Sequence, residues 1–543
     1  MDSYIIGITA YYHDSSACLF KNGEIVYACE EERFTGIKHD GSYPQNVINH
    51  IFKKYGLTKN DIECACYYEN PKLRLYRRKS FFTSLKTYIK VWWNLRKISN
   101  KIHYTPHHMS HMAYSYFSSK FTDATIVSID GVGETSTVSF GKGIDNTITE
   151  LKTVKYPHSL GLFYSAMTAF LGFKPNEGEY KVMGLAAYGD PTIYQELVNS
   201  LIKWENNTII CDMSCFNWDS SNKTMFNYEL LNRLQTAHRF SDEPITEIHK
   251  NIAASVQKRY EDIFFEIIHT AKQLFDSKNI VVGGGCAYNG TANGKLGKSK
   301  IFDKMWISLN PSDAGSSIGS CLHYLSKNKK SLHRLDENPF LGDVYTNNEI
   351  YNIIKNNKTI RYIEYKTELN SHIANELNDG KVVGWFSGKM EFGARALGNR
   401  SILANPTLSD MQNKINRVVK KREEFRPFAP MVIYEYQFEY FDSLDYIPYM
   451  NQMVNVREEY RNKLPAITHV DGSSRIQSVK KENPIYDLLG QFQEISGYPI
   501  LLNTSFNIKD KTIVRTPQEA LDTFLDTEMD ILVLENFVIY KKE

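Results

Sequence analysis

The feature that most constrains the fold of this 543-residue chain is a repeated pattern of a buried strand, a polar loop and further strands. Residues 4–9 are apolar and β-branched, and after a polar loop they are followed by a hairpin with an Asn22-Gly23 turn. The pattern recurs where the strand 124–129 runs into the loop 130–133 and then into a partner strand over 135–140. The repeat predicts two similar α/β lobes.

Polar side chains stand in the loop after the first strand. Lobes that begin with a strand, a polar loop and a hairpin are typical of actin-like ATPases, whose loops face phosphates, so we expect an actin-like first part. His13 in this loop could act as a general base near neutral pH. Asp14 beside it is better explained as a cap of the turn.

Candidate metal ligands follow in the second copy of the pattern. His107 and His111 are four residues apart, so on a helix they share one face, a common spacing for two metal ligands. Asp130 is a candidate carboxylate ligand at the end of the next strand, and Asp313 lies in a third polar loop.

A glycine-rich segment follows the strand predicted at 279–282. Gly284 and Gly285 would let the backbone approach a ligand closely, and the N-terminus of the next helix favours an anion. The position after a strand of the second lobe matches the place where actin-like proteins hold adenosine. The irregular, charged residues 327–343 predict a domain junction, with domains over 1–345 and 346–543.

Cations gather between residues 395 and 430. Prolines interrupt this stretch, so its cations cannot all lie on one solvated helical face, and several must converge on loops. Converging guanidinium groups suit phosphate or carboxylate oxygens. The alternative is a basic surface with ordinary ion pairs to Glu423 and Glu424. The cations are Arg395, Arg400, Arg417, Lys420, Lys421, Arg422 and Arg426.

Two further segments support an anion pocket. Arg475 lies in a polar, turn-rich segment. The apolar strand 498–502 runs into Asn503 and Ser505, and small polar side chains at strand ends often bind ligands in open sheets.

The bulk composition excludes some classes of protein. The net charge of +2 gives no global attraction to nucleic acid or membrane, and no run of about 18 apolar residues predicts a membrane span. Eight scattered cysteines without a CxxC pair, and an N-terminus unlike a signal peptide, favour a cytoplasmic protein. The basic, aromatic stretch 72–101 is either a nucleic-acid or membrane patch or, as we prefer, an amphipathic helix with snorkelling lysines.

Taken together, the chain resembles the nodulation-factor and antibiotic O-carbamoyltransferases, the NodU/CmcH family, over nearly its whole length. The motifs that carry the resemblance are YHDSSA (12–17), EERF (31–34), HHMSH (107–111), KVMGLAAYG (181–189), NPSDAGSS (310–317), FGARALGNRSILANP (392–406), REEFRPFAP (422–430), HVDGSSR (469–475) and LLNTSFN (501–507).

The resemblance implies an α/β fold with a two-lobed actin-like (ASKHA) domain followed by a YrdC-like domain. It implies that carbamoyl phosphate and ATP with Mg²⁺ give carbamoyl-adenylate in the second domain, and that the first domain passes the carbamoyl group to a hydroxyl of a small natural product. A homodimer is compatible with it, and no nucleic-acid or membrane partner is expected.

The resemblance also implies roles for single residues. His107, His111, Asp130 and Asp313 would hold a divalent metal, expected to be Fe²⁺, and His13 would assist transfer. Carbamoyl phosphate and the ATP phosphates would be held by Arg395, Lys420, Arg426, Arg475, Asn503 and Ser505. The adenylate would be contacted by Gly284, Gly285 and Asn289, with Lys181 as a further nucleotide-binding residue.

Three other functions compete with this one. A threonylcarbamoyl-type transferase acting on tRNA shares the folds but needs a large basic docking face. An actin-like sugar kinase would need neither the C-terminal cations nor the histidine pair. A non-catalytic scaffold would have no use for the cations or for the candidate metal ligands. The acceptor hydroxyl cannot be identified from the sequence.

Overall fold

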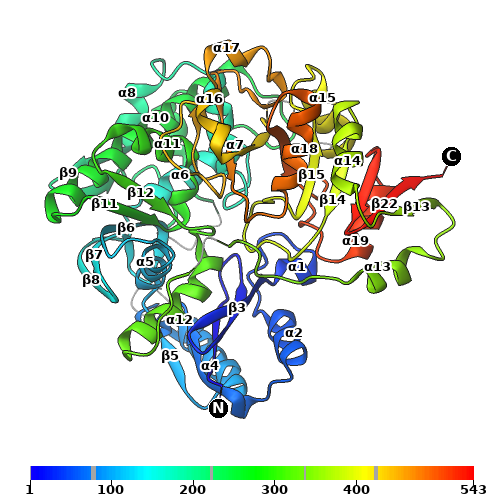
Figure 1. Ribbon diagram of the computed structural model, residues 1–543. Coiled ribbons are helices and arrows are strands. Elements are labelled where there is room, and N and C mark those ends of the chain that lie inside the picture. The colour runs from blue at the N-terminus through cyan, green and yellow to red at the C-terminus, as the bar shows by residue number, and fades with distance from the viewer. Residues whose placement is uncertain (1, 75–80, 220–223, 336–337, 421–425, 543) are drawn as a thin grey trace. The chain divides into compact units, whose positions relative to one another are not determined.

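The computed structural model describes residues 2–74, 81–219, 224–335, 338–420 and 426–542, which form two compact units (Figure 1). The first unit comprises Met1–Glu31, His39–Ala292 and Ser299–Asp336. The second comprises Glu32–Lys38, Asn293–Lys298 and Glu337–Glu543.

The first sheet of the first unit has the strand order β3-β2-β1-β4-β5. Its strands are β1 (Tyr4–Thr9), β2 (Ser16–Lys21), β3 (Glu24–Glu30), β4 (Ile62–Tyr67) and β5 (Ile102–Tyr104). β1, β2 and β3 are antiparallel neighbours, whereas β4 runs parallel to β1 and β5 parallel to β4. Asn22 and Gly23 both have positive φ, at 54° and 88°, as the predicted tight hairpin turn requires.

The second sheet repeats this topology with the order β12-β11-β6-β7-β8. Its strands are β6 (Asp123–Gly133), β7 (Ser136–Ile144), β8 (Thr147–Lys155), β11 (Asn279–Gly283) and β12 (Lys304–Ile307). Here too three antiparallel strands are followed by two parallel ones on the other side of the first strand. The repetition confirms the predicted duplication and the actin-like, two-lobed α/β architecture.

Two helices lie between the sheets of the first unit. α12 (Ser316–Lys327) packs on β1, β2 and β4, α5 (His107–Phe117) packs on β6, β7 and β11, and the two helices pack against each other. The outer faces are covered by α2 (Gln45–Tyr55) and α4 (Phe81–Ile98) on one sheet and by α6 (Leu160–Phe170) and α10 (Glu247–Leu274) on the other. α2 ends at Gly56, which adopts the left-handed conformation.

The second unit is built on one eight-stranded sheet with the order β13-β22-β21-β14-β15-β20-β16-β19. The strands are β13 (Ile360–Glu364), β14 (Val383–Phe386), β15 (Arg400–Ala404), β16 (Ala429–Ile433), β19 (Gln477–Val479), β20 (Ile500–Ser505), β21 (Ile531–Leu534) and β22 (Phe537–Lys541). Successive residues point to opposite faces, so Leu501 joins one apolar cluster while Ile500 and Leu502 join the other.

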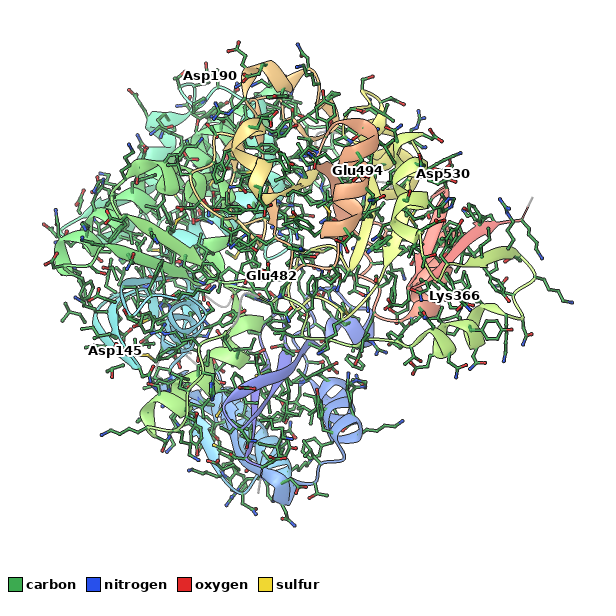
Figure 2. The ribbon with its side chains drawn as sticks, viewed as in Figure 1. Asp145, Asp190, Lys366, Glu482, Glu494 and Asp530 are labelled. Atoms are coloured by element: carbon green, nitrogen blue, oxygen red, sulfur yellow. The ribbon has the colours of Figure 1, made fainter. Side chains whose placement is uncertain are left out.

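Helices cover both faces of this sheet. α14 (Leu369–Asn378) and α18 (Tyr486–Ser496) supply one apolar cluster, and α13 (Asn347–Ile354) and α19 (Pro517–Leu525) supply the other. Burial on both faces explains why central strands of this sheet, such as β14 and β21, are almost continuously apolar in sequence. Charged side chains such as Asp145 and Asp190 of the first unit and Lys366 and Glu494 of the second are exposed (Figure 2).

Two predicted loops are in fact continuations of strands. β6 does not stop at Ile129 but extends through Asp130 to Gly133, with an irregular register in between. β20 likewise continues through Asn503 to Ser505. In both cases the backbone stays paired with a neighbouring strand beyond the end of the apolar run. The sequence indicates a strand only through its apolar run, so the extension could not be predicted.

The close packing of α12 on the first sheet depends on Gly7. A methyl group at this position would lie 2.0 Å from the Ser317 carbonyl oxygen and 2.7 Å from Cys321 Sγ. We expect Gly7→Ala to lower the thermal midpoint of the first unit, because overpacking of a tight core typically costs about 1–3 kcal/mol. Calorimetry of the purified variant measures this effect.

Gly490→Ala is the control for this experiment. Gly490 lies within α18, and nothing lies within 4 Å of the added methyl group. This variant should keep or raise the midpoint because alanine favours a helix. An unchanged midpoint in Gly7→Ala would contradict the tight contact between α12 and β1.

Candidate functional site

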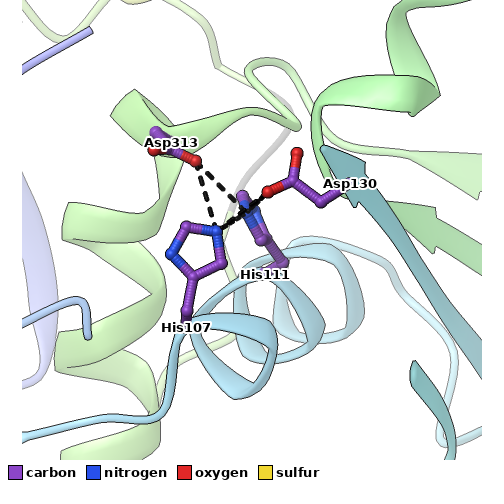
Figure 3. A group of neighbouring side chains, drawn as sticks. All are labelled: His107, His111, Asp130 and Asp313. Atoms are coloured by element: carbon purple, nitrogen blue, oxygen red, sulfur yellow. Dashed lines mark hydrogen bonds and ion pairs between the residues drawn. The ribbon is translucent and has the colours of Figure 1, made fainter. Parts of the chain in front are cut away.

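Four predicted metal ligands meet in the first unit (Figure 3). His107 and His111 stand one turn apart on α5, Asp130 lies on β6, and Asp313 begins the short 3-10 helix Asp313–Gly315 before α12. All four side chains are buried, and one ligand atom of each lies within 4.8 Å of the others. The duplicated fold therefore brings together the residues that the sequence analysis named from distant segments.

The distances within this cluster are short. His107 Nε2 lies 3.0 Å from Asp130 Oδ2 and 3.4 Å from Asp313 Oδ1. His111 Nε2 lies 3.4 Å from Asp313 Oδ1 and 3.8 Å from Asp130 Oδ2. The two imidazole Nε2 atoms are 3.0 Å apart.

This arrangement fits a divalent cation. The two Nε2 atoms face each other so closely that both cannot carry a proton between them, whereas two lone pairs can share a cation. Neither oxygen of the buried Asp313 carboxylate accepts a hydrogen bond from the described residues. Two imidazoles and two carboxylates are a donor set that suits Fe²⁺, Mn²⁺ or Zn²⁺.

Neighbouring groups fix the orientation of two of these ligands. The backbone N–H of Gly285 donates to Asp130 Oδ1 at 3.0 Å, which leaves Oδ2 toward the imidazoles. Ser316 Oγ lies 3.1 Å from His111 Nδ1, so the opposite nitrogen of that ring faces the cluster. Such outer contacts commonly set the tautomer and orientation of metal ligands.

Glu134 supports the helix that carries both histidines. The residue before α5 is Pro106, which supplies no side-chain cap, and the backbone N–H of His107 instead donates to Glu134 Oε1 at 3.0 Å. Glu134 Oε1 also accepts from the N–H of Asn70 at 2.7 Å. Glu134 is not among the residues predicted from the sequence, where its only signal is an acidic residue in the turn that follows β6.

The electrostatics of the cluster favour ion pairs. Burial alone would lower the pKa of His107, but the carboxylates of Asp313 and Asp130 raise it to about 9. Burial would raise the pKa of Asp130, but hydrogen bonds and charge from His107 and His111 hold it well below its usual range. Burial, together with the charge of His107, lowers the pKa of the neighbouring His108 to about 3. His108 is therefore neutral and differs from its two neighbours on the helix.

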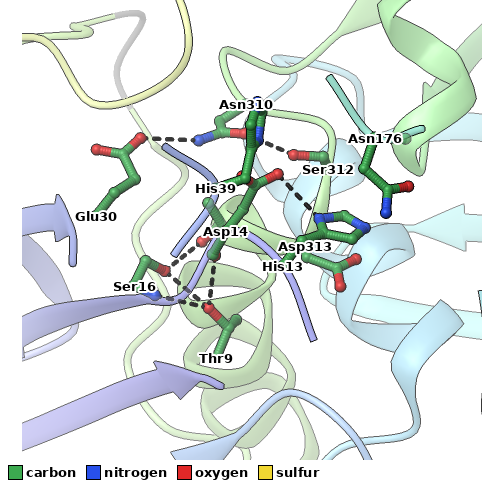
Figure 4. Close-up of polar contacts among 12 residues, drawn as sticks. Thr9, His13, Asp14, Ser16, Glu30, His39, Asn176, Asn310, Ser312 and Asp313 are labelled. Carbon is green, nitrogen blue, oxygen red and sulfur yellow. Dashed lines mark hydrogen bonds and ion pairs between the residues drawn. The ribbon is translucent and has the colours of Figure 1, made fainter. Parts of the chain in front are cut away.

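The polar loop after β1 holds His13 against Asp14 (Figure 4). His13 Nδ1 lies 3.0 Å from Asp14 Oδ2, and His39 Nδ1 lies 2.6 Å from Asp14 Oδ1. Burial would lower the pKa of His13, but the charges of Asp313 and Asp14 raise it to about 10. Asp14 thus orients the His13 ring, a role additional to the turn cap that the sequence predicts.

The predicted adenylate contacts have clear structural roles. Gly284 has φ of 86°, and a methyl group there would lie 2.2 Å from the Ile129 carbonyl oxygen, so only glycine fits between β11 and β6. Asn289 caps α11 (Gly290–Ser299) by accepting from the N–H of Ala292 at 3.0 Å. Lys181 lies on α7 (Glu179–Leu185), with its ammonium 5.5 Å from the Phe173 ring centre. A nucleotide role for these residues stays a prediction.

In the second unit, Lys420 is buried at the end of the π-helix Ile415–Lys420. Its ammonium donates to both Ser505 and Asn507, reaching the Asn507 carbonyl oxygen at 3.0 Å and its Oδ1 at 2.8 Å. The predicted lysine and the predicted strand end are therefore in direct contact.

The segments that carry the predicted arginines also converge. Asn503 pairs in the sheet with Ala429, three residues after Arg426. Its side-chain N–H₂ donates to the Ala396 carbonyl at 3.0 Å and to Gln477 Oε1 at 3.2 Å, which places it beside the segments of Arg395 and Arg475. Arg395, Arg426 and Arg475 are each half-buried. Asn503 Oδ1 is buried and accepts no hydrogen bond from the described residues.

Arg400 does not belong to the anion pocket that the sequence suggested. It is fully buried, with its guanidinium 3.5 Å from the Phe386 ring centre, and it donates to the carbonyl oxygens of Ser387 and Asn399 at 3.0 Å. Burial lowers its pKa to about 10, despite the charge of Glu391. The sequence does not reveal that this cation starts a central strand.

Glu391 shapes the loop between Arg395 and Arg400. One of its oxygens, Oε1, accepts the backbone N–H groups of Leu397, Asn399 and Arg400, at 2.8, 2.8 and 3.1 Å. Four residues that the sequence analysis included in the basic stretch or its ion pairs lie outside the described residues: Lys421, Arg422, Glu423 and Glu424.

Comparison with protein families gives matches over most of the chain. The family model described as "Carbamoyltransferase N-terminus" matches residues 4–94 and 74–322. The model described as "Carbamoyltransferase C-terminus" matches residues 374–541.

Similar proteins include relatives that match almost the whole of this chain. An uncharacterized protein of Synechocystis is 37% identical over 99% of this chain and 97% of its own. The nodulation protein NolNO of Sinorhizobium fredii is 34% identical over 98% of this chain and 79% of its own. Among solved structures, component A of (R)-2-hydroxyglutaryl-CoA dehydratase from Acidaminococcus fermentans covers 60% of this chain and 98% of its own, with a TM-score of 0.34 and 16% identity.

Within the part of the chain that the structure describes, every helix is too short or too polar to cross a bilayer.

The His/Asp cluster predicts a metal that depends on both histidines. We expect the double variant His107→Ala, His111→Ala to lose nearly all bound metal, because two carboxylates alone hold a transition metal weakly. Elemental analysis of the purified protein measures this loss.

His108→Asn is the matched control, since His108 lies on the same helix and is equally buried but is not part of the cluster. This variant should keep its metal. A folded double variant that retains stoichiometric metal would contradict the assignment.

Proposed function

Because the chain belongs to the carbamoyltransferase family, we propose that it is an ATP-dependent O-carbamoyltransferase acting on a hydroxyl of a small natural product. The observation that carries the proposal is the pairing of a buried His/Asp cluster in the first unit with converging cations in the second. The small natural-product acceptor is proposed on the basis of the family resemblance.

The first half-reaction belongs to the predicted domain 346–543, which we propose to be YrdC-like. Water hydrolyses carbamoyl phosphate to carbamate and inorganic phosphate, and a carbamate oxygen then attacks the α-phosphorus of ATP while pyrophosphate leaves. The product is carbamoyl-adenylate. Arg395, Arg426 and Arg475 offer guanidinium groups to the phosphates as charge develops on the leaving group.

Lys420 and the end of β20 organise this site. The buried ammonium joins the π-helix to Ser505 and Asn507, so Lys420 is held at the end of β20. The unsatisfied Oδ1 of Asn503 is a ready acceptor for an N–H group, and the carbamoyl NH₂ is such a donor. Mg²⁺ would accompany ATP, as it does for most nucleotide substrates.

The second half-reaction belongs to the predicted domain 1–345. The acceptor hydroxyl oxygen attacks the carbonyl carbon of carbamoyl-adenylate, the bond from that carbon to the phosphate oxygen breaks so that AMP leaves with the electron pair, and the hydroxyl proton passes to water. His13, held by Asp14, is our candidate for assisting this transfer. Gly284, Gly285, Asn289 and Lys181 are the proposed adenylate contacts.

A divalent metal fits His107, His111, Asp130 and Asp313, and we propose Fe²⁺ on the basis of the family resemblance. When bound, such an ion supplies Lewis-acid polarisation of the carbonyl group and charge for the AMP phosphate. The protein contributes the fixed ligand orientations, through Gly285 and Ser316, and the burial that excludes water.

A cytoplasmic location, a homodimer and the domain boundary at 345/346 stay predictions, as does the absence of a nucleic-acid partner.

The first prediction concerns the cations of the second unit. Arg395→Ala and Arg426→Ala should each slow pyrophosphate release from ATP and carbamoyl phosphate by about ten- to a hundredfold or more, because one charge-assisted hydrogen bond contributes roughly 1.5–3 kcal/mol. Arg395→Lys should also be impaired, since lysine keeps the charge but loses the planar fork. Pyrophosphate is measured without acceptor.

Lys509→Ala serves as the control, because Lys509 is an exposed cation of the same unit outside the cluster. Both arginine variants should still transfer the group from supplied carbamoyl-adenylate. Normal pyrophosphate release in the arginine variants would place adenylation elsewhere.

The second prediction concerns His13. His13→Ala should leave pyrophosphate release intact but slow acceptor carbamoylation by about 10²–10⁴-fold, the usual effect of losing a proton-transfer group. Asp14→Asn should show a smaller loss in the same step. The His13 ring keeps a hydrogen-bond partner in this variant, but that partner no longer carries a negative charge. If both steps fall together in His13→Ala, His13 has no specific part in transfer.

A further inference from the structure

The chain concentrates positive charge in one segment that the proposed chemistry does not use. Residues 70–101 contain ten lysines and arginines and no aspartate or glutamate, and the next acidic residue is Asp123. The whole chain has a net charge of only +2, so the remainder is net acidic. The small net charge therefore conceals a strongly basic segment.

Within this segment, α4 divides into two faces. Val91, Leu95 and Ile98 are buried, and they recur at the spacing of one helical face. The opposite face carries five exposed residues at positions that also recur every three or four residues: Lys86, Ile89, Lys90, Trp93 and Lys97. Three lysines thus lie next to two large apolar side chains on one solvent-facing stripe.

The apolar members of this stripe are exposed to solvent. Trp93 is 59% exposed and Ile89 is 46% exposed, although neither is needed to cover the core. They are four residues apart and so lie side by side on the helix. An exposed Trp–Ile pair beside lysines is neither a solvated charged face nor a core face. An amphipathic helix with snorkelling lysines accounts for the lysines but does not explain why this apolar pair is exposed.

The rest of the first unit holds this stripe in place. Asn94 donates to the Tyr11 hydroxyl at 2.7 Å, and the Lys90 ammonium lies 4.7 Å from the centre of the same ring. Arg96 lies over the Trp92 ring, 5.6 Å from its centre, so Trp92 is held while Trp93 is left exposed. The stripe is therefore presented by a helix that is packed on the protein.

From this geometry we propose that α4 binds the surface of a membrane that contains anionic lipids. The helix would lie in the plane of the interface, with Trp93 and Ile89 inserted at the level of the headgroups and with Lys86, Lys90 and Lys97 against the lipid phosphates. Tryptophan favours this level of a bilayer, and each lysine near an anionic surface strengthens binding about fivefold.

A membrane explains the stripe better than a nucleic acid does. The exposed cations of the stripe are lysines, which act as point charges, whereas recognition of nucleic acid commonly uses arginine forks. Ile89 is aliphatic and cannot stack on a base, but it can enter a lipid interface. The earlier expectation of no membrane partner rested on the net charge and on the lack of a spanning segment, and neither excludes binding at a surface.

Binding of the full chain to vesicles tests the proposal. We expect sedimentation with vesicles of phosphatidylcholine and phosphatidylserine, little with phosphatidylcholine alone, and loss of binding as salt increases. Lys86→Glu, Lys97→Glu should weaken binding about 25-fold or more, since two lysines are lost. Trp93→Ala should weaken it about tenfold through lost apolar burial.

Matched variants control for charge and for hydrophobicity. Lys203→Glu, Lys278→Glu makes the same change of net charge at exposed sites outside α4. Ile193→Ala removes an apolar side chain with the same 59% exposure as Trp93. Both control variants should bind vesicles like the unmodified protein, and the thermal midpoints of all variants should agree because every altered side chain is exposed.

Three results would overturn the proposal. They are equal binding to both kinds of vesicle, unchanged binding in the α4 variants, and binding of transfer RNA that the α4 variants abolish while vesicles are not bound. The last result would favour a nucleic-acid function for the same stripe.

Discussion

The first unit is organised around two buried carboxylates that face two buried imidazoles. Asp130 and Asp313 come from different parts of the duplicated fold, and each would be costly to bury without a compensating charge. His107 and His111 supply part of that compensation, but their Nε2 atoms lie 3.0 Å apart, which disfavours two protonated rings. A shared cation satisfies all four groups at once. The positions of α5, β6 and the start of α12 can thus be understood as the geometry that one ion requires.

The second unit handles charge in a different way. Its buried ammonium, Lys420, is surrounded by oxygen atoms of Ser505 and Asn507, and the buried Glu391 carboxylate is surrounded by backbone N–H groups. Both arrangements fix loops next to the half-buried Arg395, Arg426 and Arg475. The protein thereby uses hydrogen-bonded buried charges to hold the segments beside these three arginines. These two local arrangements are the basis on which we propose a metal site in the first unit and an anion site in the second.

Much of this arrangement is predictable from the sequence because it depends on periodicity. The duplicated strands, the shared face of His107 and His111, and the grouping of basic and Asn/Ser segments all leave local patterns. Glu134, Ser316 and Glu391 were missed because each acts on a partner that exists only in the folded chain. Arg400 was misassigned because burial against Phe386 cannot be recognised in a basic, glycine-rich segment. Asp130 and Asn503 were expected in loops because strand pairing beyond an apolar run leaves no signal.

The central claim is that this carbamoyltransferase activates the carbamoyl group by adenylation before transferring it. The most direct test follows ATP by phosphorus NMR during incubation with carbamoyl phosphate and the unmodified protein. The account predicts that pyrophosphate and an AMP species form together, with inorganic phosphate released from carbamoyl phosphate, and that no ADP accumulates. ADP as the nucleotide product, or consumption of carbamoyl phosphate with ATP unchanged, would contradict it.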